Sequence, residues 1–229
     1  MTRHRSKPTC VYCGKGEGTT RDHVPPQYLF PKPRPELVTV PCCETCRRSQ
    51  SLNDEYFVRT IAMRSDVDND PTTKLVLDAV HRSFTKPQKI GFTRALIDSM
   101  SELPVYTPAG VYLGHASFFD SDLTRLCNVI ERVTRGLYYH EYGARLPDAH
   151  RCVTYALDGF ASAGSEDKGR VRQLFDQACL GKERTLGGNV FKYWFQSVVG
   201  PEPATLWAFL VYGRVGFVAL TMPGGRGRG

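Results

Sequence analysis

Two Cys-x-x-Cys pairs constrain the fold of this chain more than any other feature of its sequence. The pairs are Cys10/Cys13 and Cys43/Cys46, and Cys43 follows Cys13 by 30 positions. Each pair places two thiolates on one tight turn, and four thiolates form a closed tetrahedral site that suits zinc. Cys42 is less suited as a ligand, because with Cys46 it gives the wider spacing Cys-x-x-x-Cys. We therefore expect a structural Zn2+ that replaces part of the core of a small N-terminal unit.

The cellular compartment decides how the eight cysteines are interpreted. The N-terminal stretch 1–10 is basic and lacks an apolar segment, and no apolar run approaches the roughly 20 residues needed to cross a bilayer. We therefore expect a cytoplasmic protein without a membrane segment. In such a reducing compartment, paired cysteines indicate metal ligands rather than disulfides. The isolated Cys127, Cys152 and Cys179 are interpreted as packing residues.

Positive charge is concentrated at the N-terminus. Residues 1–50 contain nine Lys or Arg and four Asp or Glu, so this stretch carries +5 of the net charge of +7. A concentration of this kind favours a polyanionic partner, although a solvated basic face gives the same composition. The cysteine pairs favour the first interpretation.

Residue patterns predict an α+β fold in two parts. Residues 1–65 are expected to form a zinc-stapled module in which two short strands precede an amphipathic helix over about 46–64. Residues 66–229 are expected to form an α+β accessory domain with a long helix over 123–142 and a mostly antiparallel sheet. Substrate positioning, homodimer formation or contact with a partner protein are the roles expected of this second part.

Asp22 and His23 lie on the first predicted strand, between the two cysteine pairs. Consecutive strand residues point to opposite faces unless the strand is bulged or ends there. Hydrolysis of a phosphodiester needs a cation that neutralises charge and a base that takes a proton from water. A carboxylate that binds the cation and an imidazole with a near-neutral pKa supply one of each.

The order of these motifs resembles the zinc-bracketed HNH endonucleases of the ββα-metal class. The resemblance covers residues 10–57, from the first cysteine pair through Asp22-His23 and the second pair to the helix that follows. It implies that His23 is the general base and that Asp22 binds Mg2+ or Mn2+. It also implies that the four cysteines hold zinc and that DNA is the usual substrate. Similar C-terminal extensions accompany HNH modules in bacteria and phages, so a defence setting is expected.

Arg47 departs from the pattern of this family. The family commonly has Asn or His directly after the second cysteine pair as a metal ligand, and an arginine stays protonated and cannot replace it. Asp54 or Asn53, further along the same helix, could supply the second ligand. Alternatively, Arg47 holds the scissile phosphate and Asp22 binds the metal together with water. A third alternative is a module that has lost activity and only binds.

These observations lead to one hypothesis and one rival. The hypothesis is a metal-dependent HNH endonuclease that cuts double-stranded DNA, with Arg21, Arg47 and Arg48 as phosphate contacts. The rival is a catalytically inactive zinc-ribbon module that binds nucleic acid or a partner protein. Both keep the zinc and the salt-sensitive binding, and only the first depends on Mg2+ or Mn2+.

Overall fold

The computed structural model describes residues 8–67, 71–84, 90–157, 165–199 and 203–224. Its N-terminal part is a hairpin of two antiparallel strands, joined through a short 3-10 helix and followed by a helix. These elements are β1 (Thr20–Val24), η1 (Gln27–Leu29), β2 (Val38–Cys42) and α1 (Glu44–Ala62). Pro25 and Pro26 follow β1 directly and end its pairing.

The rest of the chain adds four helices and seven strands within the described residues. In chain order they are α2 (Pro71–Phe84), α3 (Ile90–Asp98), β3 (Met100–Tyr106), β4 (Tyr112–Phe119), α4 (Leu123–Tyr142), β5 (His150–Ala156), α5 (Ser165–Ala178), β6 (Lys182–Leu186), β7 (Phe191–Val198), β8 (Ala204–Val211) and β9 (Val215–Pro223). Strands β3 and β4 form a separate hairpin. The other five form one antiparallel sheet in the order β5-β9-β8-β7-β6.

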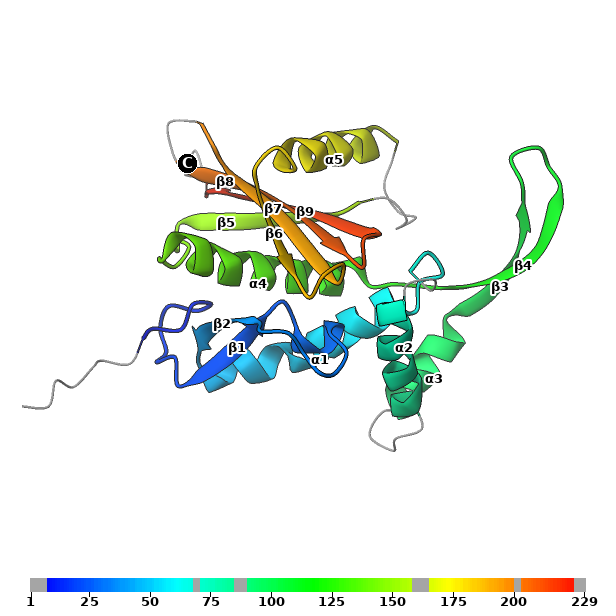
Figure 1. Cartoon of the computed structure of the whole chain (residues 1–229), viewed down its shortest axis with the longest axis horizontal. Helices are drawn as coiled ribbons and strands as arrows, with labels where there is room; N and C mark the ends of the chain where they lie inside the picture. Colours follow the sequence, from blue (N-terminus) through cyan, green and yellow to red (C-terminus); the bar gives the residue numbers. More distant parts are fainter. Residues whose placement is uncertain (1–7, 68–70, 85–89, 158–164, 200–202, 225–229) are drawn as a thin grey trace, which may run out of the picture.

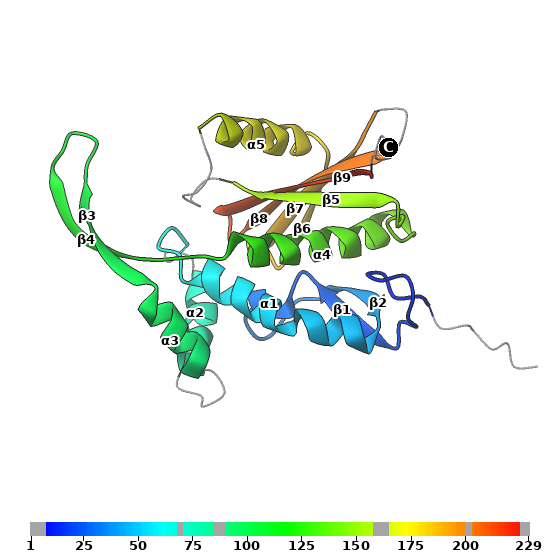
Figure 2. The same ribbon diagram turned by 180° about the vertical axis from the view of Figure 1, so that it is seen from behind.

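The main body is layered, with α4 at its centre. Helix α5 covers one face of the five-stranded sheet and α4 covers the other, while the N-terminal hairpin and α1 lie on the far side of α4 (Figures 1 and 2). Helices α2 and α3 and the β3–β4 hairpin extend to one side of this body. None of the helices in the described ranges is long and apolar enough to cross a membrane.

The caps and the small and apolar residues of helix α4 suit its central position. The Asp122 side chain accepts a hydrogen bond from the Arg125 backbone N–H at 3.1 Å and caps the first turn. Gly143 ends the helix with a φ of 68°. Gly136 allows close packing against the hairpin, because a Cβ atom there would lie 2.6 Å from a methyl group of Val24. The buried residues of α4 are Leu126, Val129, Ile130, Arg132, Val133, Thr134, Gly136 and Leu137.

The sheet explains the apolar character of the C-terminal sequence. In β7 the buried residues Phe191, Tyr193 and Phe195 alternate with half-buried ones, as expected for a strand near the edge. Strands β8 and β9 are buried almost throughout, because helices cover both faces of the sheet. The Trp207 ring stacks on Phe195 with centroids 5.0 Å apart.

The predicted α+β class and antiparallel sheet are confirmed, and the long helix has the predicted bounds of 123–142. Strand β6 was not predicted, because Lys182–Leu186 is an exposed, polar edge strand. The pattern of residues 105–119, with a turn at 108–110, predicts a hairpin, and the observed hairpin begins earlier, at Met100. The Gly200-Pro201 dipeptide also predicts a turn, and this position lies outside the described residues.

The division into residues 1–65 and 66–229 stays a prediction, although one buried cluster crosses it. This cluster joins Val24 of β1 and Phe57 of α1 to Ile130 of α4 and Phe217 of β9. The Phe57 and Phe217 rings lie 5.7 Å apart. A core shared in this way couples the stability of the N-terminal unit to that of the sheet.

We predict that Phe57→Ala lowers the free energy of unfolding by about 3–5 kcal/mol, because the ring is 1% exposed and leaves a cavity. Urea unfolding followed by tryptophan fluorescence measures the loss. Zinc release, followed in the same urea titration, should have the same midpoint as the fluorescence change, because the core is shared. Leu180→Ala, at an 83% exposed position, is the control and should change stability by less than about 0.5 kcal/mol. Separate midpoints for fluorescence and zinc release would contradict the shared core.

Candidate metal centre and the Asp22 cluster

The predicted cysteine pairs meet at one point. The Sγ atoms of Cys10, Cys13, Cys43 and Cys46 all lie within 4.8 Å of one another. The Sγ atoms of Cys13 and Cys43 are 3.8 Å apart. A tetrahedron with Zn–S bonds of about 2.3 Å has an edge of about 3.8 Å, so the four thiols fit a zinc ion.

Local backbone structure brings the four sulfur atoms together. The first pair lies on a turn in which the Gly14 N–H donates to the Cys10 carbonyl at 3.0 Å and the Cys10 N–H donates to the Gly16 carbonyl at 2.8 Å. Gly14 has a φ of 65°, which glycine adopts without strain. The second pair lies at the start of α1, where Cys43 is the N-cap residue. A turn and a helix N-terminus therefore hold the two halves of the cluster.

Geometry separates the four ligand candidates from Cys42, because its sulfur atom is not one of the four that converge. Hydrogen bonds from the Lys15 and Gly16 N–H groups lower the pKa of Cys13 to about 6, which favours the thiolate that zinc binds. Burial raises the pKa of Cys42 to about 12, and it raises the pKa of the ligand candidate Cys46 as well, so the thiol pKa does not separate these two. The Cys42 thiol donates to the Cys43 carbonyl at 3.3 Å. Cys42 is therefore a buried neighbour of the cluster, and the pair Cys43/Cys46 is the better assignment.

The Asp22 side chain is held by one of its two oxygens. Its Oδ2 atom accepts a hydrogen bond from the Tyr12 hydroxyl at 2.6 Å and another from Arg132 Nη1 at 2.8 Å. The side chain is 12% exposed. No hydrogen bond from the residues in the described ranges reaches its Oδ1 atom. Asp22 therefore has a fixed orientation and retains one carboxylate oxygen.

Arg132 joins Asp22 to Asp54. It lies on the buried face of α4, and its second terminal nitrogen, Nη2, donates to Asp54 Oδ1. Burial lowers the pKa of Arg132, but the charges of Asp54 and Asp22 outweigh this effect and hold it above its ordinary value. Burial raises the pKa of Asp54 to about 6, although Arg132 acts in the opposite direction. Arg132 therefore lies between the two carboxylates, and the cation that joins them is a guanidinium.

Asn53 is also engaged by an arginine of α4. Its Oδ1 atom accepts a hydrogen bond from Arg125 Nε at 3.0 Å, and Arg125 Nη2 donates to the Leu52 carbonyl at 2.9 Å. The ligand roles predicted for Asn53 and Asp54 stay predictions, although both side chains have protein partners. In the part of the chain that the structure describes, the four cysteines are the one group of three or more His, Cys, Asp or Glu side chains placed to hold an ion.

His23 lies on the opposite face of β1 from Asp22. The pairing with β2 is regular, with Asp22 opposite Val40 and His23 opposite Thr39, so no bulge brings the two side chains to one face. His23 is half-buried. Arg21 shares its face and donates to Thr39 Oγ1 at 2.8 Å. Among the described residues β1 pairs with β2 alone, so its other edge has no strand partner.

Arg47 and Arg48 lie on the exposed first turns of α1. Arg47 donates to Glu44 through Nε at 3.0 Å and Nη2 at 2.8 Å, and Arg48 Nε donates to Glu44 at 2.7 Å. These hydrogen bonds lower the pKa of Glu44 to about 2. Such exposed ion pairs are screened by salt, so both guanidinium groups are accessible to a phosphate.

A basic groove lies beside η1. It has a volume of about 920 Å³ and lies between α1, α2 and the loop around η1. Four basic residues and one acidic residue, Glu55, line it. The basic residues are Lys32, Arg34, Arg59 and Arg82. The groove extends the positive charge of the N-terminal part towards α2.

Sequence reasoning missed Tyr12 and Arg132. Arg132 lies 110 positions from Asp22, so no local pattern connects the two residues. One signal was present, because Arg132 falls within the apolar stripe of the long helix, next to Val129 and Val133. A buried arginine on such a stripe requires an acidic partner on another element.

We predict that Cys43→Ala abolishes zinc binding and unfolds the N-terminal unit, because three thiolates no longer close the site. Cys42→Ala is the matched control and should keep the zinc, because the Cys42 sulfur is not one of the four that converge. Atomic absorption should find one zinc per chain in the wild type and in Cys42→Ala, and none in Cys43→Ala. Loss of zinc in Cys42→Ala would contradict the ligand assignment.

We predict that Arg132→Ala lowers the free energy of unfolding by about 3–5 kcal/mol, because it leaves two mostly buried carboxylates without their cation. Arg125→Ala is the control, since it also removes an arginine that joins α4 to α1, at a more exposed position. Its expected cost is about 1 kcal/mol. Urea unfolding at neutral pH measures both losses, and equal costs would contradict the special role of Arg132.

Comparisons with known proteins add no family assignment to this geometry. No family model, no curated protein and no solved structure matches the chain. The features that bear on function are therefore the cysteine cluster, the Asp22 cluster and the basic surface.

Proposed function

We propose that this protein is a metal-dependent endonuclease of the HNH type that hydrolyses phosphodiester bonds in DNA. The observation that carries the proposal is the anchoring of Asp22 through a single oxygen. Carboxylates that bind catalytic metals are commonly fixed by hydrogen bonds of this kind from surrounding residues. His23 is the next residue on the same strand, so a carboxylate and an imidazole project from consecutive backbone positions of β1.

Asp22 alone suits a magnesium ion that arrives with its substrate. Mg2+ usually takes one or two protein carboxylates and completes its shell with water and phosphate oxygens. Asp22 Oδ1 would hold such an ion, which neutralises charge on the phosphate and on the leaving oxygen. His23 then takes a proton from the attacking water. In this proposal the phosphate lies along the edge of β1 that has no strand partner in the described residues, between the faces of Asp22 and His23.

Asp54 and Asn53 have a different role in this proposal. Arg132 lies between Asp54 and Asp22, and its positive charge opposes a second cation at that point. The Asn53 side chain is also engaged, because its Oδ1 atom accepts a hydrogen bond from Arg125 Nε. We therefore propose the alternative in which Arg47, at the usual Asn or His position, contacts the scissile phosphate. A guanidinium can form two parallel hydrogen bonds to a phosphate.

The distribution of charge supports DNA as the substrate. Arg21, Arg47 and Arg48 are exposed on β1 and α1. The basic groove, with Lys32 and Arg82 among its lining residues, extends this surface beyond η1. Phosphate contacts of this kind give affinity that falls steeply with salt. Zinc in the cysteine cluster would hold the start of α1 against the hairpin and so fix Arg47 relative to Asp22.

The second candidate is a binding module without catalytic activity, and two observations favour it. Arg132 already neutralises Asp22, and the regular register of β1 directs His23 to the other face. Such a module would keep the zinc and the salt-sensitive affinity for nucleic acid or a partner protein. It would show no dependence on Mg2+ or Mn2+, which separates the two candidates.

We predict that the purified zinc-loaded protein nicks supercoiled plasmid with Mg2+ or Mn2+ and not with EDTA. His23→Ala should lower the rate by about 100-fold or more, because general-base catalysis contributes about this much. Gel electrophoresis of timed samples measures the rate. His140→Ala is the control, since this histidine is exposed near the end of α4 and should leave the rate unchanged.

The same preparations decide between the two candidates. Salt-dependent DNA binding by the wild type and by His23→Ala, without metal-dependent cutting by either, would favour the binding module. Equal cutting by both proteins would show that His23 is not the base. Neither DNA binding nor cutting by the wild type would contradict both candidates.

A further inference from the structure

The β3–β4 hairpin is an arm that no other described strand or helix covers. Residues 100–119 form two strands that pair with each other and with no other strand of the described ranges. The arm projects from the side of the molecule (Figures 1 and 2). An isolated two-stranded hairpin is at best marginally stable in water, so an arm of this length needs a further partner.

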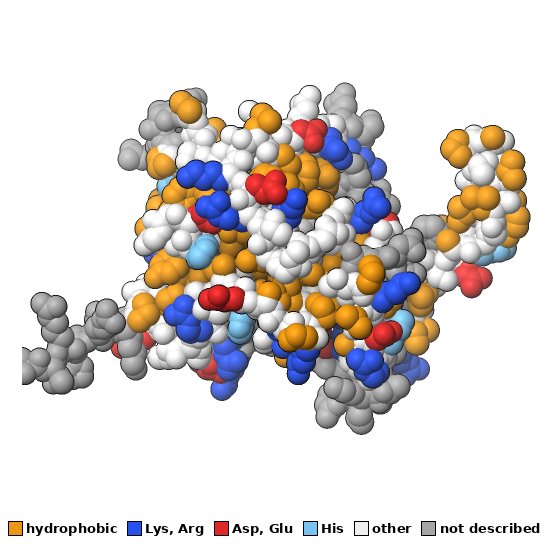
Figure 3. All heavy atoms as spheres, viewed as in Figure 1, with side chains coloured by type: hydrophobic (Ala, Val, Ile, Leu, Met, Phe, Trp, Pro, Cys, Tyr) orange, Lys and Arg blue, Asp and Glu red, His pale blue; other side chains and the backbone are white. Residues whose placement is uncertain are grey.

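The surface of the arm is apolar and almost uncharged. Figure 3 shows hydrophobic side chains over much of it. Large side chains that are 43–64% exposed line both strands and the tip, namely Met100, Leu103, Tyr106, Val111, Tyr112 and Leu113. The arm has no Lys or Arg, and Glu102 is its one acidic residue. In a chain of net charge +7, this composition suits a protein surface and not a nucleic acid.

Both edges of the arm are also open. The outer edge of each strand carries backbone N–H and C=O groups that no other strand of the described residues pairs. Proteins usually protect such edges with lysine, bulges or a covering element. The one bulge here lies near the tip, between Val105 and Tyr106. The arm therefore offers edge pairing as well as apolar contact.

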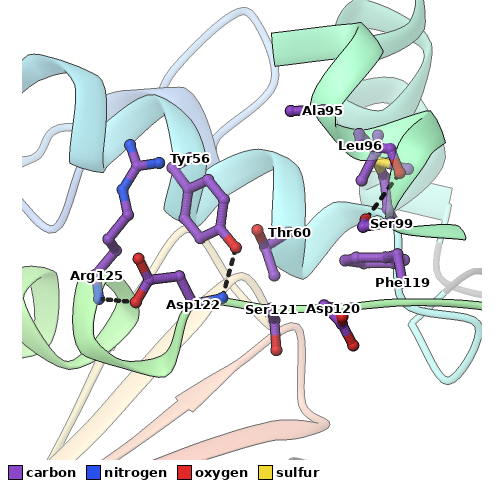
Figure 4. Close-up of a pocket in the computed structure, with 11 residues that line it drawn as sticks. Tyr56, Thr60, Ala95, Leu96, Ser99, Phe119, Asp120, Ser121, Asp122 and Arg125 are labelled. Carbon is purple, nitrogen blue, oxygen red and sulfur yellow. Dashed lines mark hydrogen bonds between the residues drawn. The ribbon is translucent and has the colours of Figure 1, made fainter.

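A preformed pocket lies at the root of the arm. It has a volume of about 380 Å³, with apolar lining from Met63, Leu96 and Phe119. Figure 4 shows Tyr56 and Arg125 at one side of it. The Tyr56 hydroxyl accepts a hydrogen bond from the Asp122 N–H at 2.7 Å, and the Arg125 guanidinium lies 4.1 Å from the Tyr56 ring centre.

The rim of this pocket is therefore ordered by contacts between α1 and the start of α4. An apolar side chain could enter without rearrangement of these residues.

We propose that two copies of this chain form a two-fold dimer in which their arms lie side by side and antiparallel. A two-fold axis places the tip of each arm beside the root of the other. The apolar tip, Val111 to Leu113, then enters the partner's root pocket. Strand β4 alone spans about 26 Å at about 3.3 Å per residue, so tip and root are well separated within one chain.

The size of the surfaces is consistent with a stable dimer. Each protomer would contribute the twenty residues of the arm and ten further residues of the root pocket. Standard interfaces use about 20–30 residues on each side. This inference does not depend on the proposed nuclease function, because none of the arm residues belongs to the Asp22 cluster or the cysteine cluster.

The test is the molar mass of the full zinc-loaded chain by light scattering at about 100 µM, which is well above a micromolar Kd. The wild type should have twice the chain mass of 25.7 kDa. Leu113→Asp at the tip and Ala95→Trp in the pocket should each give the single chain mass. Leu180→Asp, at an exposed position outside the arm, is the control and should stay dimeric.

Mixing the two monomeric variants tests the tip-to-pocket contact itself. A dimer of Leu113→Asp with Ala95→Trp contains one intact tip and one intact pocket facing each other, so the mixture should regain dimer. A monomeric wild type, or a dimeric Leu113→Asp, would overturn the proposed dimer. A mixture that stays monomeric would overturn the entry of the tip into the partner's pocket.

Discussion

The two ion pairs of the buried Arg132 guanidinium are the interactions on which the arrangement of β1, α1 and α4 depends. The guanidinium joins three elements that are distant in the sequence, since Asp22 lies on β1, Asp54 on α1 and Arg132 on α4. Its Nε atom is buried without a hydrogen-bond partner in the described residues, so the two carboxylates provide its hydrogen bonds. Removing one partner of such a group leaves an uncompensated buried charge, and this fixes the arrangement of all three elements.

The position of α4 follows from this interaction and from the apolar residues around it. One side of α4 packs on the sheet and the other on the hairpin and α1, so the N-terminal unit shares its core with the C-terminal part. The cysteine cluster fixes the hairpin at the opposite end from η1. Two kinds of constraint, four thiols and one ion-pair network, therefore orient Asp22, and neither uses its second oxygen.

The sequence predicted the features that depend on local patterns. The cysteine spacing predicted the cluster, and the caps and apolar stripe predicted the bounds of α4. Asp54 was predicted only as one possible second ligand of a cation at Asp22, and that role stays a prediction. Arg132 and Tyr12 were not predicted as partners of Asp22, because tertiary packing brings them there. The polar strand β6 was missed for a related reason, since only its pairing with β7 defines it.

The most direct test of a metal role for Asp22 is a Mn2+ titration followed by electron paramagnetic resonance. It uses zinc-loaded His23→Ala protein bound to a DNA duplex, which this variant should leave intact, beside the same protein with Asp22→Asn. We expect one Mn2+ per chain, above the binding of the duplex alone, in the first protein and none in the second. Equal Mn2+ binding by the two proteins, or none by either, would contradict the role of Asp22 as the ligand.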